Sequence, residues 1–128
     1  MNREPLGKSQ IRPLETRLAM LEAVTSTRPW LQVVVTDQLH LADIAQGYDV
    51  LVLGADKWSQ VLDPGFYASV DERDAAVARL PRLAVAPRHD FELPPACVLL
   101  DVDLSHVSST AAREGQTDLV LPEALPFL

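Results

Sequence analysis

Apolar residues follow two patterns along this chain, one typical of a helix and one typical of buried strands. After Pro13, apolar side chains recur at i, i+4, i+7 and i+10, which places them on one face of a helix. This stripe consists of Leu14, Leu18, Leu21 and Val24. Proline suits the first helical turn, because the N–H that it lacks would be unpaired there. The pattern therefore predicts a helix that opens at Pro13.

Other apolar runs are short and continuous, and they do not alternate with polar residues. They cover residues 31–36, 49–53, 83–86 and 98–102. Such runs are typical of strands that are covered on both faces. Further helices are predicted at residues 39–46, 71–80 and 108–114. Asp71 is the expected N-cap of the second of these, Gly115 ends the third, and a helical turn is expected in the tail after residue 119.

The alternation of strands and helices favours an α/β fold. It predicts a mostly parallel sheet of about four strands with helices on both faces. The 128 residues fit one domain, and a hydrophobic fraction of 48% is enough to form a buried core. We therefore expect a single domain over residues 1–128.

Charge and cysteine content narrow the classes of function. The net charge of −7 argues against a broad nucleic-acid-binding face, which needs Lys and Arg to neutralise phosphates. A small phosphate ligand needs only a few donors and remains compatible. Cys97 is the single cysteine and is expected to be a small core residue in a reducing compartment. Because no run of 18 apolar residues and no signal-peptide pattern occurs, the sequence predicts a cytoplasmic protein without a membrane partner.

Chemistry is expected where parallel strands end, because ligands of open parallel sheets bind beyond the carboxyl ends of the strands. Gly54, Ala55 and Asp56 directly follow the run 49–53. A glycine lets a ligand approach the backbone closely, and a carboxylate can accept hydrogen bonds from ribose hydroxyls. The alternative is a plain turn in which Asp56 caps the next segment.

A second candidate segment lies at the start of the predicted C-terminal helix. Ser108, Ser109 and Thr110 cluster there, and Arg113 follows Ser109 by one helical turn. Free N–H groups at a helix start attract anions, and an arginine on the same face adds a charge-assisted hydrogen bond. The alternative is an ordinary serine cap beside a solvated arginine.

The two segments together resemble nucleotidyltransferases of the nicotinate-nucleotide adenylyltransferase and cytidylyltransferase-like family. That family carries Gly-x-Asp after a central strand and Ile-Ser-Ser-Thr-x-x-Arg near its C-terminus, which correspond here to residues 54–56 and 107–113. Residues 6–8 with Lys8, the helix with Arg17 and the closing segment 119–125 are similar to further family segments in the same order. The implied fold is an incomplete Rossmann-like nucleotidyltransferase domain.

The resemblance implies transfer of AMP or CMP from ATP or CTP to a mononucleotide such as nicotinate mononucleotide, with release of pyrophosphate, as in NAD biosynthesis. Mg²⁺ would accompany the triphosphate and would not be held by a protein motif. The residues implied to bind the nucleotide are Gly54, Asp56, Ser108, Ser109, Thr110 and Arg113, with Lys8 as a further phosphate contact. Such catalysis consists mostly of positioning and charge stabilisation.

The chain departs from the family pattern in two respects. The family begins with a strand and a His-x-Gly-His motif that stabilises the triphosphate, whereas His40, His89 and His106 do not form that motif. No catalytic residue or metal ligand is therefore assigned, and the domain is expected to be N-terminally truncated relative to the family and poorly active. Trp58 follows Asp56 too closely to match the family's ring-stacking tryptophan and is expected to pack.

Three functions remain open from the sequence. The first is an enzyme whose N-terminal segment is missing from this sequence, and the second is a non-catalytic nucleotide-binding or interaction protein that keeps the phosphate site. The third is an interaction domain in which the motifs are relics. Loss of a central strand leaves unpaired edges, and a homodimer is one way to cover them.

Overall fold

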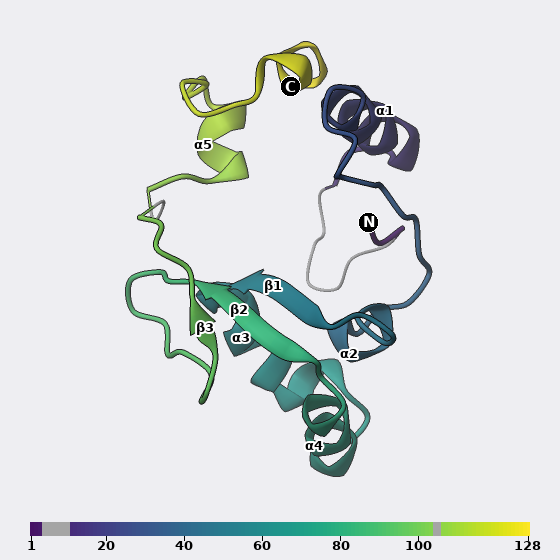
Figure 1. The fold of residues 1–128 in the computed structure, drawn as a ribbon, viewed down its shortest axis with the longest axis vertical. Coiled ribbons are helices and arrows are strands. Elements are labelled where there is room, and N and C mark those ends of the chain that lie inside the picture. Colours follow the sequence, from purple (N-terminus) through teal and green to yellow (C-terminus); the bar gives the residue numbers. More distant parts are fainter. Residues whose placement is uncertain (4–10, 104–105) are drawn as a thin grey trace. The chain divides into compact units, whose positions relative to one another are not determined.

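The computed structural model describes residues 1–3, 11–103 and 106–128, which belong to two compact units. Unit 1 comprises Met1–Asp37 and His106–Leu128, and unit 2 comprises Gln38–Ser105. Figure 1 shows the elements of both units along the chain. The expected single domain stays a prediction.

Unit 2 is built on a three-stranded parallel sheet in the order β1-β2-β3 (Figure 1). Its strands are β1 (Val50–Gly54), β2 (Arg82–Ala86) and β3 (Val98–Leu99). Leu53 lies opposite Val85 in the register of β1 and β2, and Ala84 lies opposite Val98 in that of β2 and β3. A parallel pair needs a crossover, which the helices after β1 supply.

The helices of unit 2 are short. They are α2 (Leu41–Ile44), α3 (Ala55–Leu62), the 3₁₀ turn η1 (Pro64–Phe66) and α4 (Val70–Ala78). Asp63 begins η1 by accepting a hydrogen bond from the Gly65 amide through its side chain at 2.8 Å. α2 precedes β1, and the other three follow closely on one another between β1 and β2.

The core of unit 2 lies between α3 and one face of the sheet. Because side chains alternate along a strand, Leu53 and Val85 share a face. There they pack with Trp58, Ala55 and Val61 of α3. The opposite face carries Val50 and Val52, which are both exposed. The structure thus confirms a mixed α/β fold with a small parallel sheet, and β1 is exposed on the face opposite α3.

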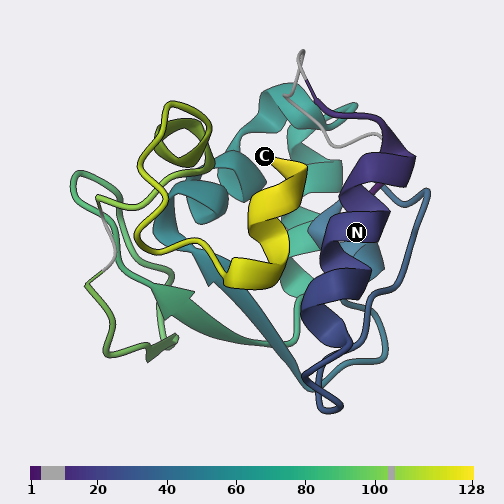
Figure 2. The same ribbon diagram turned by 90° about the horizontal axis from the view of Figure 1, so that it is seen from above.

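Unit 1 brings the two ends of the chain together. It contains α1 (Leu14–Thr25), α5 (Ser109–Arg113) and the 3₁₀ helix η2 (Pro122–Phe127). Figure 2 shows η2 running alongside α1, and the two are in contact. Arg28, just after α1, forms an ion pair with Glu123 of η2 at 3.1 Å. The predicted helices after Pro13 and around 108–114 are confirmed, as is the helical turn in the tail.

One predicted strand is absent and another is shorter than predicted. Residues 31–36 are extended but form no strand of the sheet, since the described pairing is an isolated parallel bridge between Asn2 and Thr36. The apolar run has the composition of a strand, but a strand also needs a neighbour along its length. β3 ends at Leu99, earlier than the predicted residue 102, because its neighbour β2 ends just before Pro87, which has no N–H to continue the ladder.

Two predictions about helices also need correction. No helix was predicted between residues 54 and 70, whereas α3 forms there, and Ala55, Trp58 and Val61 follow a helical spacing. The N-cap of α4 is Ser69, whose side chain accepts a hydrogen bond from the Glu72 amide at 3.1 Å, and not Asp71. In the part of the chain that the structure describes, no helix is long and apolar enough to cross a membrane.

Candidate functional site

The Gly54–Asp56 segment lies at the carboxyl end of β1, where the chain passes directly into α3. Gly54 is both the last residue of β1 and the N-cap of α3, and Asp56 lies in the first turn of the helix. A Cβ on Gly54 would lie only 2.5 Å from Asp56 Oδ1. The glycine therefore makes room for the neighbouring carboxylate, a close approach within the protein itself.

Arg88 is the partner of Asp56 that the sequence analysis missed. Its Nε lies 3.4 Å from Asp56 Oδ1, and about half of the Asp56 side chain is exposed. Arg88 comes two residues after the end of β2, the parallel neighbour of β1. Residues that follow neighbouring parallel strands meet at one edge of the sheet. The position of Arg88 after β2 would therefore have indicated this pair if β1 and β2 had been known to be neighbours. The pair presents one carboxylate and one guanidinium at the edge where ligands of such sheets bind.

The Ser-Ser-Thr segment begins α5 in unit 1. Ser108 is its N-cap, and its hydroxyl accepts a hydrogen bond from the Ala111 amide at 3.0 Å. This is the ordinary capping role, so the Ser108 hydroxyl is already engaged with its own helix. Arg113 Nη2 donates to Thr110 Oγ1 at 3.3 Å. Thr110 therefore holds the arginine against its helix.

Ser109 and Arg113 open onto a cavity of about 770 Å³ within unit 1, called the arginine cavity below. Its lining comes from the chain before and within α1, from α5, and from the C-terminal segment with η2. The lining residues are Ile11, Arg12, Arg17, Met20, Ser109, Ala112, Arg113, Val120, Ala124, Phe127 and Leu128. Among these described residues are three arginines and no acidic side chain.

The three arginines of this cavity differ in how they are held. Arg17 donates to three backbone carbonyl oxygens, those of Arg12 at 2.9 Å, Asn2 at 2.9 Å and Arg3 at 2.8 Å. Its guanidinium thus fixes the chain before α1. Arg12 Nη1 donates to the Phe127 carbonyl oxygen at 2.6 Å. A guanidinium has five N–H donors, so the described bonds of Arg12 and Arg113 leave donors that can serve a ligand.

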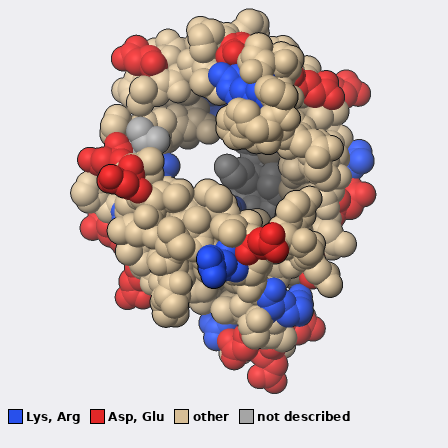
Figure 3. Space-filling view, viewed as in Figure 1, with Lys and Arg blue, Asp and Glu red and all other residues tan. Residues whose placement is uncertain are grey.

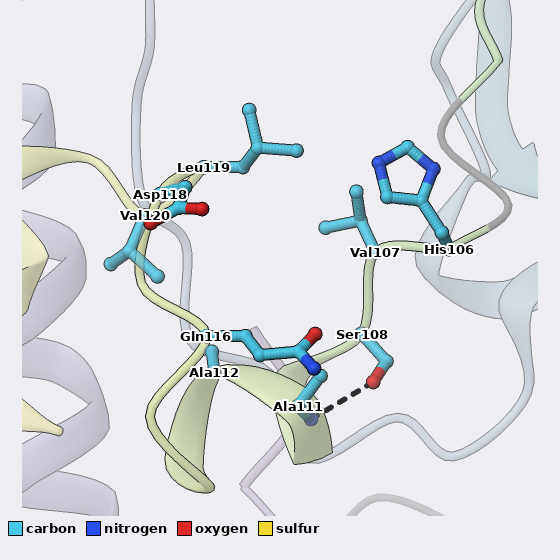
Figure 4. A pocket seen from close by; sticks show the side chains of 9 residues that line it. All are labelled: His106, Val107, Ser108, Ala111, Ala112, Gln116, Asp118, Leu119 and Val120. Atoms are coloured by element: carbon cyan, nitrogen blue, oxygen red, sulfur yellow. Dashed lines mark hydrogen bonds between the residues drawn. The ribbon is translucent and has the colours of Figure 1, made fainter.

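A second cavity of about 330 Å³ also lies at the start of α5 (Figure 4). Ser108 lines this cavity, whereas Ser109 lines the arginine cavity. Figure 4 shows the Gln116 side chain extending toward Ser108. His106, Asp118 and apolar residues complete the lining. Of these two cavities, Ser108 therefore lines one, and Ser109 lines the other together with Arg113.

Two aromatic residues of unit 2, Trp58 and Tyr67, pack against other side chains, as was expected of Trp58. Trp58 is buried in the core, with 5% of its surface exposed. The Tyr67 ring stacks on His40 with centroids 4.5 Å apart, and its hydroxyl donates to the Val61 carbonyl at 2.9 Å. Burial raises the pKa of Tyr67 above its ordinary value. These contacts anchor the loop after α3.

Charges outside the candidate segments do not gather into a basic face around α4. At the foot of Figure 3, where α4 lies, acidic and basic side chains are interspersed. One example is Arg73, which pairs with Asp74 at 2.8 Å. Within residues 1–3, 11–103 and 106–128, no three His, Cys, Asp or Glu side chains come together as metal ligands would. Lys8, the further predicted phosphate contact, lies outside the described residues.

The predicted site residues thus fall into two groups. Ser108, Ser109, Thr110 and Arg113 belong to unit 1, whereas Gly54 and Asp56 belong to unit 2. Comparison of the chain with known protein families, with curated proteins and with solved structures found no match. The resemblance to nucleotidyltransferases stays a prediction from the motif segments and their order along the chain.

Proposed function

We propose that this chain is a cytoplasmic nucleotide-binding α/β protein related to the nicotinate-nucleotide adenylyltransferases. The observation that supports this most strongly is the arginine cavity. Two residues assigned to phosphate by the resemblance, Ser109 and Arg113, line it together with Arg12 and Arg17. The incomplete Rossmann-like fold and the descent from nucleotidyltransferases are parts of the same proposal.

The charge of the cavity favours an anionic ligand. The chain carries a net charge of −7, yet three guanidinium groups line this space without an acidic side chain among the described lining residues. Guanidinium groups bind phosphate oxygens through paired, charge-assisted hydrogen bonds. A volume of about 770 Å³ also lies in the range of small-molecule sites. A nucleoside triphosphate, with Mg²⁺ bound to its own phosphates, fits this chemistry.

The resemblance assigns the ribose to Gly54 and Asp56. The Asp56 side chain is about half exposed, so its carboxylate is able to accept hydrogen bonds from hydroxyl groups, and Arg88 orients it. In the full proposal, AMP or CMP passes from ATP or CTP to a mononucleotide such as nicotinate mononucleotide. These residues would contribute positioning and charge neutralisation. Because its 128 residues contain no His-x-Gly-His, we expect little or no turnover from this chain.

Titration calorimetry of the chain with ATP and with CTP in the presence of Mg²⁺, and with nicotinate mononucleotide, tests the proposal. We expect Arg113→Ala to weaken triphosphate binding about tenfold, because a hydrogen bond to a charged group is lost. Arg79→Ala is the matched control, since Arg79 is an exposed arginine of unit 2 that pairs with Asp43. Unchanged affinity in Arg113→Ala would remove the phosphate-binding assignment.

The alternative is an interaction domain without a nucleotide. The exposed Val50 and Val52 side chains of the sheet favour it, because parallel sheets are ordinarily covered on both faces. A second copy of the chain is one such cover, and the molecular mass from analytical ultracentrifugation shows whether a homodimer forms. Absence of heat with every nucleotide would favour this alternative, and a pyrophosphate-release rate typical of a full enzyme would contradict the expectation of low activity.

A further inference from the structure

The lining of the arginine cavity contains apolar side chains as well as arginines. Besides its three arginines and Ser109, its lining consists of Ile11, Met20, Ala112, Val120, Ala124, Phe127 and Leu128. A bare phosphate or a sugar phosphate would satisfy the guanidinium groups and leave these apolar walls in contact with water. A ligand that matches the whole lining must carry an apolar part beside its anionic part.

Phe127 is the aromatic residue of this lining, and it is held close to one of the cations. Arg12 Nη1 donates to the Phe127 carbonyl oxygen at 2.6 Å, which joins the cation and the aromatic residue. The other end of η2 is fixed through Glu123, whose Oε1 accepts hydrogen bonds from Thr27 at 3.0 Å and from Arg28 at 3.1 Å. η2 is therefore attached to the chain around α1 at both of its ends, and Phe127 is positioned before a ligand binds.

We propose that unit 1 binds the base as well as the phosphates of a nucleotide, with the phosphates on Arg12 and Arg113 and the base against Phe127. This rests on the proposed function and extends it, because it assigns the base to the C-terminal segment. An aromatic ring stacks on any nucleobase, and the neighbouring apolar side chains complete the base pocket. The ligand class is an aromatic nucleotide, as opposed to an inorganic polyphosphate or an alkyl phosphate.

The test compares ATP with inorganic tripolyphosphate, both with Mg²⁺, by calorimetry on the whole chain. The two share their phosphate groups and differ in the nucleoside. We expect the unaltered chain to bind ATP more tightly than tripolyphosphate. In Phe127→Leu, the affinity for ATP should fall about five- to tenfold through loss of stacking, and the affinity for tripolyphosphate should stay the same.

Two further variants serve as controls. Phe127→Tyr keeps the aromatic ring and should bind ATP as the unaltered chain does, which also covers the case in which Phe127→Leu fails to fold. Phe91→Leu changes an exposed phenylalanine of unit 2 and should leave both affinities unchanged.

The outcomes separate this inference from the proposed function. If neither ATP nor tripolyphosphate binds, the proposed function itself fails. If both bind equally well, or if Phe127→Leu weakens both to the same extent, phosphate binding stands and the assignment of the base to Phe127 is overturned. An alkyl phosphate of equal charge that binds as tightly as ATP would likewise overturn the aromatic ligand class.

Discussion

Gly54 joins β1 directly to α3, as the last residue of the strand and the N-cap of the helix. From the sequence, a glycine after a strand indicated room for a ligand. In the structure, the space beside its Cα is taken by Asp56 Oδ1, and its φ of −80° is accessible to any residue. What the glycine permits is the placement of the Asp56 carboxylate beside Arg88.

The change Gly54→Ala should therefore affect binding more than stability. A Cβ at this position displaces the Asp56 side chain, which is able to rotate away, so we expect weaker ATP binding with an unfolding free energy within about 1 kcal/mol of the original. Calorimetry and urea unfolding measure the two effects.

Gly47→Ala is the matched control within the same unit. Gly47 has a φ of +88° with open space around it, so alanine there should cost about 1–2 kcal/mol of stability and leave ATP affinity unchanged. The opposite result, with binding lost in Gly47→Ala and kept in Gly54→Ala, would contradict the role given to Gly54.

At the scale of elements, local patterns were sufficient wherever an element carries its own signal. The stripe after Pro13 predicted α1, and the serine start with Gly115 at its end predicted α5. α3 was missed because β1 passes into it without a loop, and Gly-Ala-Asp has the composition of a turn. Arg88 could not be paired with Asp56 without knowing that β1 and β2 are neighbours, which is a property of the sheet and not of either segment.

Substitution of Trp58 tests the packing of α3 on the sheet. Removing a buried tryptophan leaves a cavity, so Trp58→Ala should lower the unfolding free energy by about 3–5 kcal/mol. The chain offers a control in its other tryptophan, Trp30, which is 79% exposed. Trp30→Ala should change stability by less than about 0.5 kcal/mol. Urea unfolding followed by circular dichroism measures both, and equal effects would show that α3 does not pack as described.

At the scale of the whole molecule, the two ends of the chain meet in unit 1 through a small charged network. Glu123 of η2 accepts hydrogen bonds from Thr27 and Arg28, which are about 95 positions earlier. A hydrogen bond from its own backbone amide, and then those from Arg28 and Thr27, hold the pKa of Glu123 below its ordinary value. No local pattern in the sequence indicates this pairing, because its members are separated by the whole of unit 2.

The lowered pKa of Glu123 predicts how the stability of the fold depends on pH. A carboxyl group whose pKa is lower in the folded state stabilises the fold at neutral pH, and it loses that effect as the pH falls through the lowered value. Glu123→Gln should therefore have a lower urea midpoint than the unaltered chain at pH 7. This difference should shrink as the pH drops below the ordinary range of glutamate, about 4.3.

The pH series has its own control. Glu92→Gln alters an exposed glutamate of unit 2 and should track the unaltered chain at every pH. A difference in urea midpoint between Glu123→Gln and the unaltered chain that stays the same at every pH would contradict the prediction. It would show that the charge of Glu123 does not contribute to stability.

The division of unit 1 into two distant stretches has a consequence for how the molecule is made. Unit 2 is continuous, so its contacts can form once residues 38–105 have emerged from the ribosome. The arginine cavity needs Arg12 and Phe127 at once, and these lie at opposite ends of the chain. Closing so long a loop is entropically costly, and a folded unit 2 shortens the flexible part of it. During translation the arginine cavity therefore forms only after both Arg12 and Phe127 have emerged, and the nucleotide binding that we propose has to wait for both.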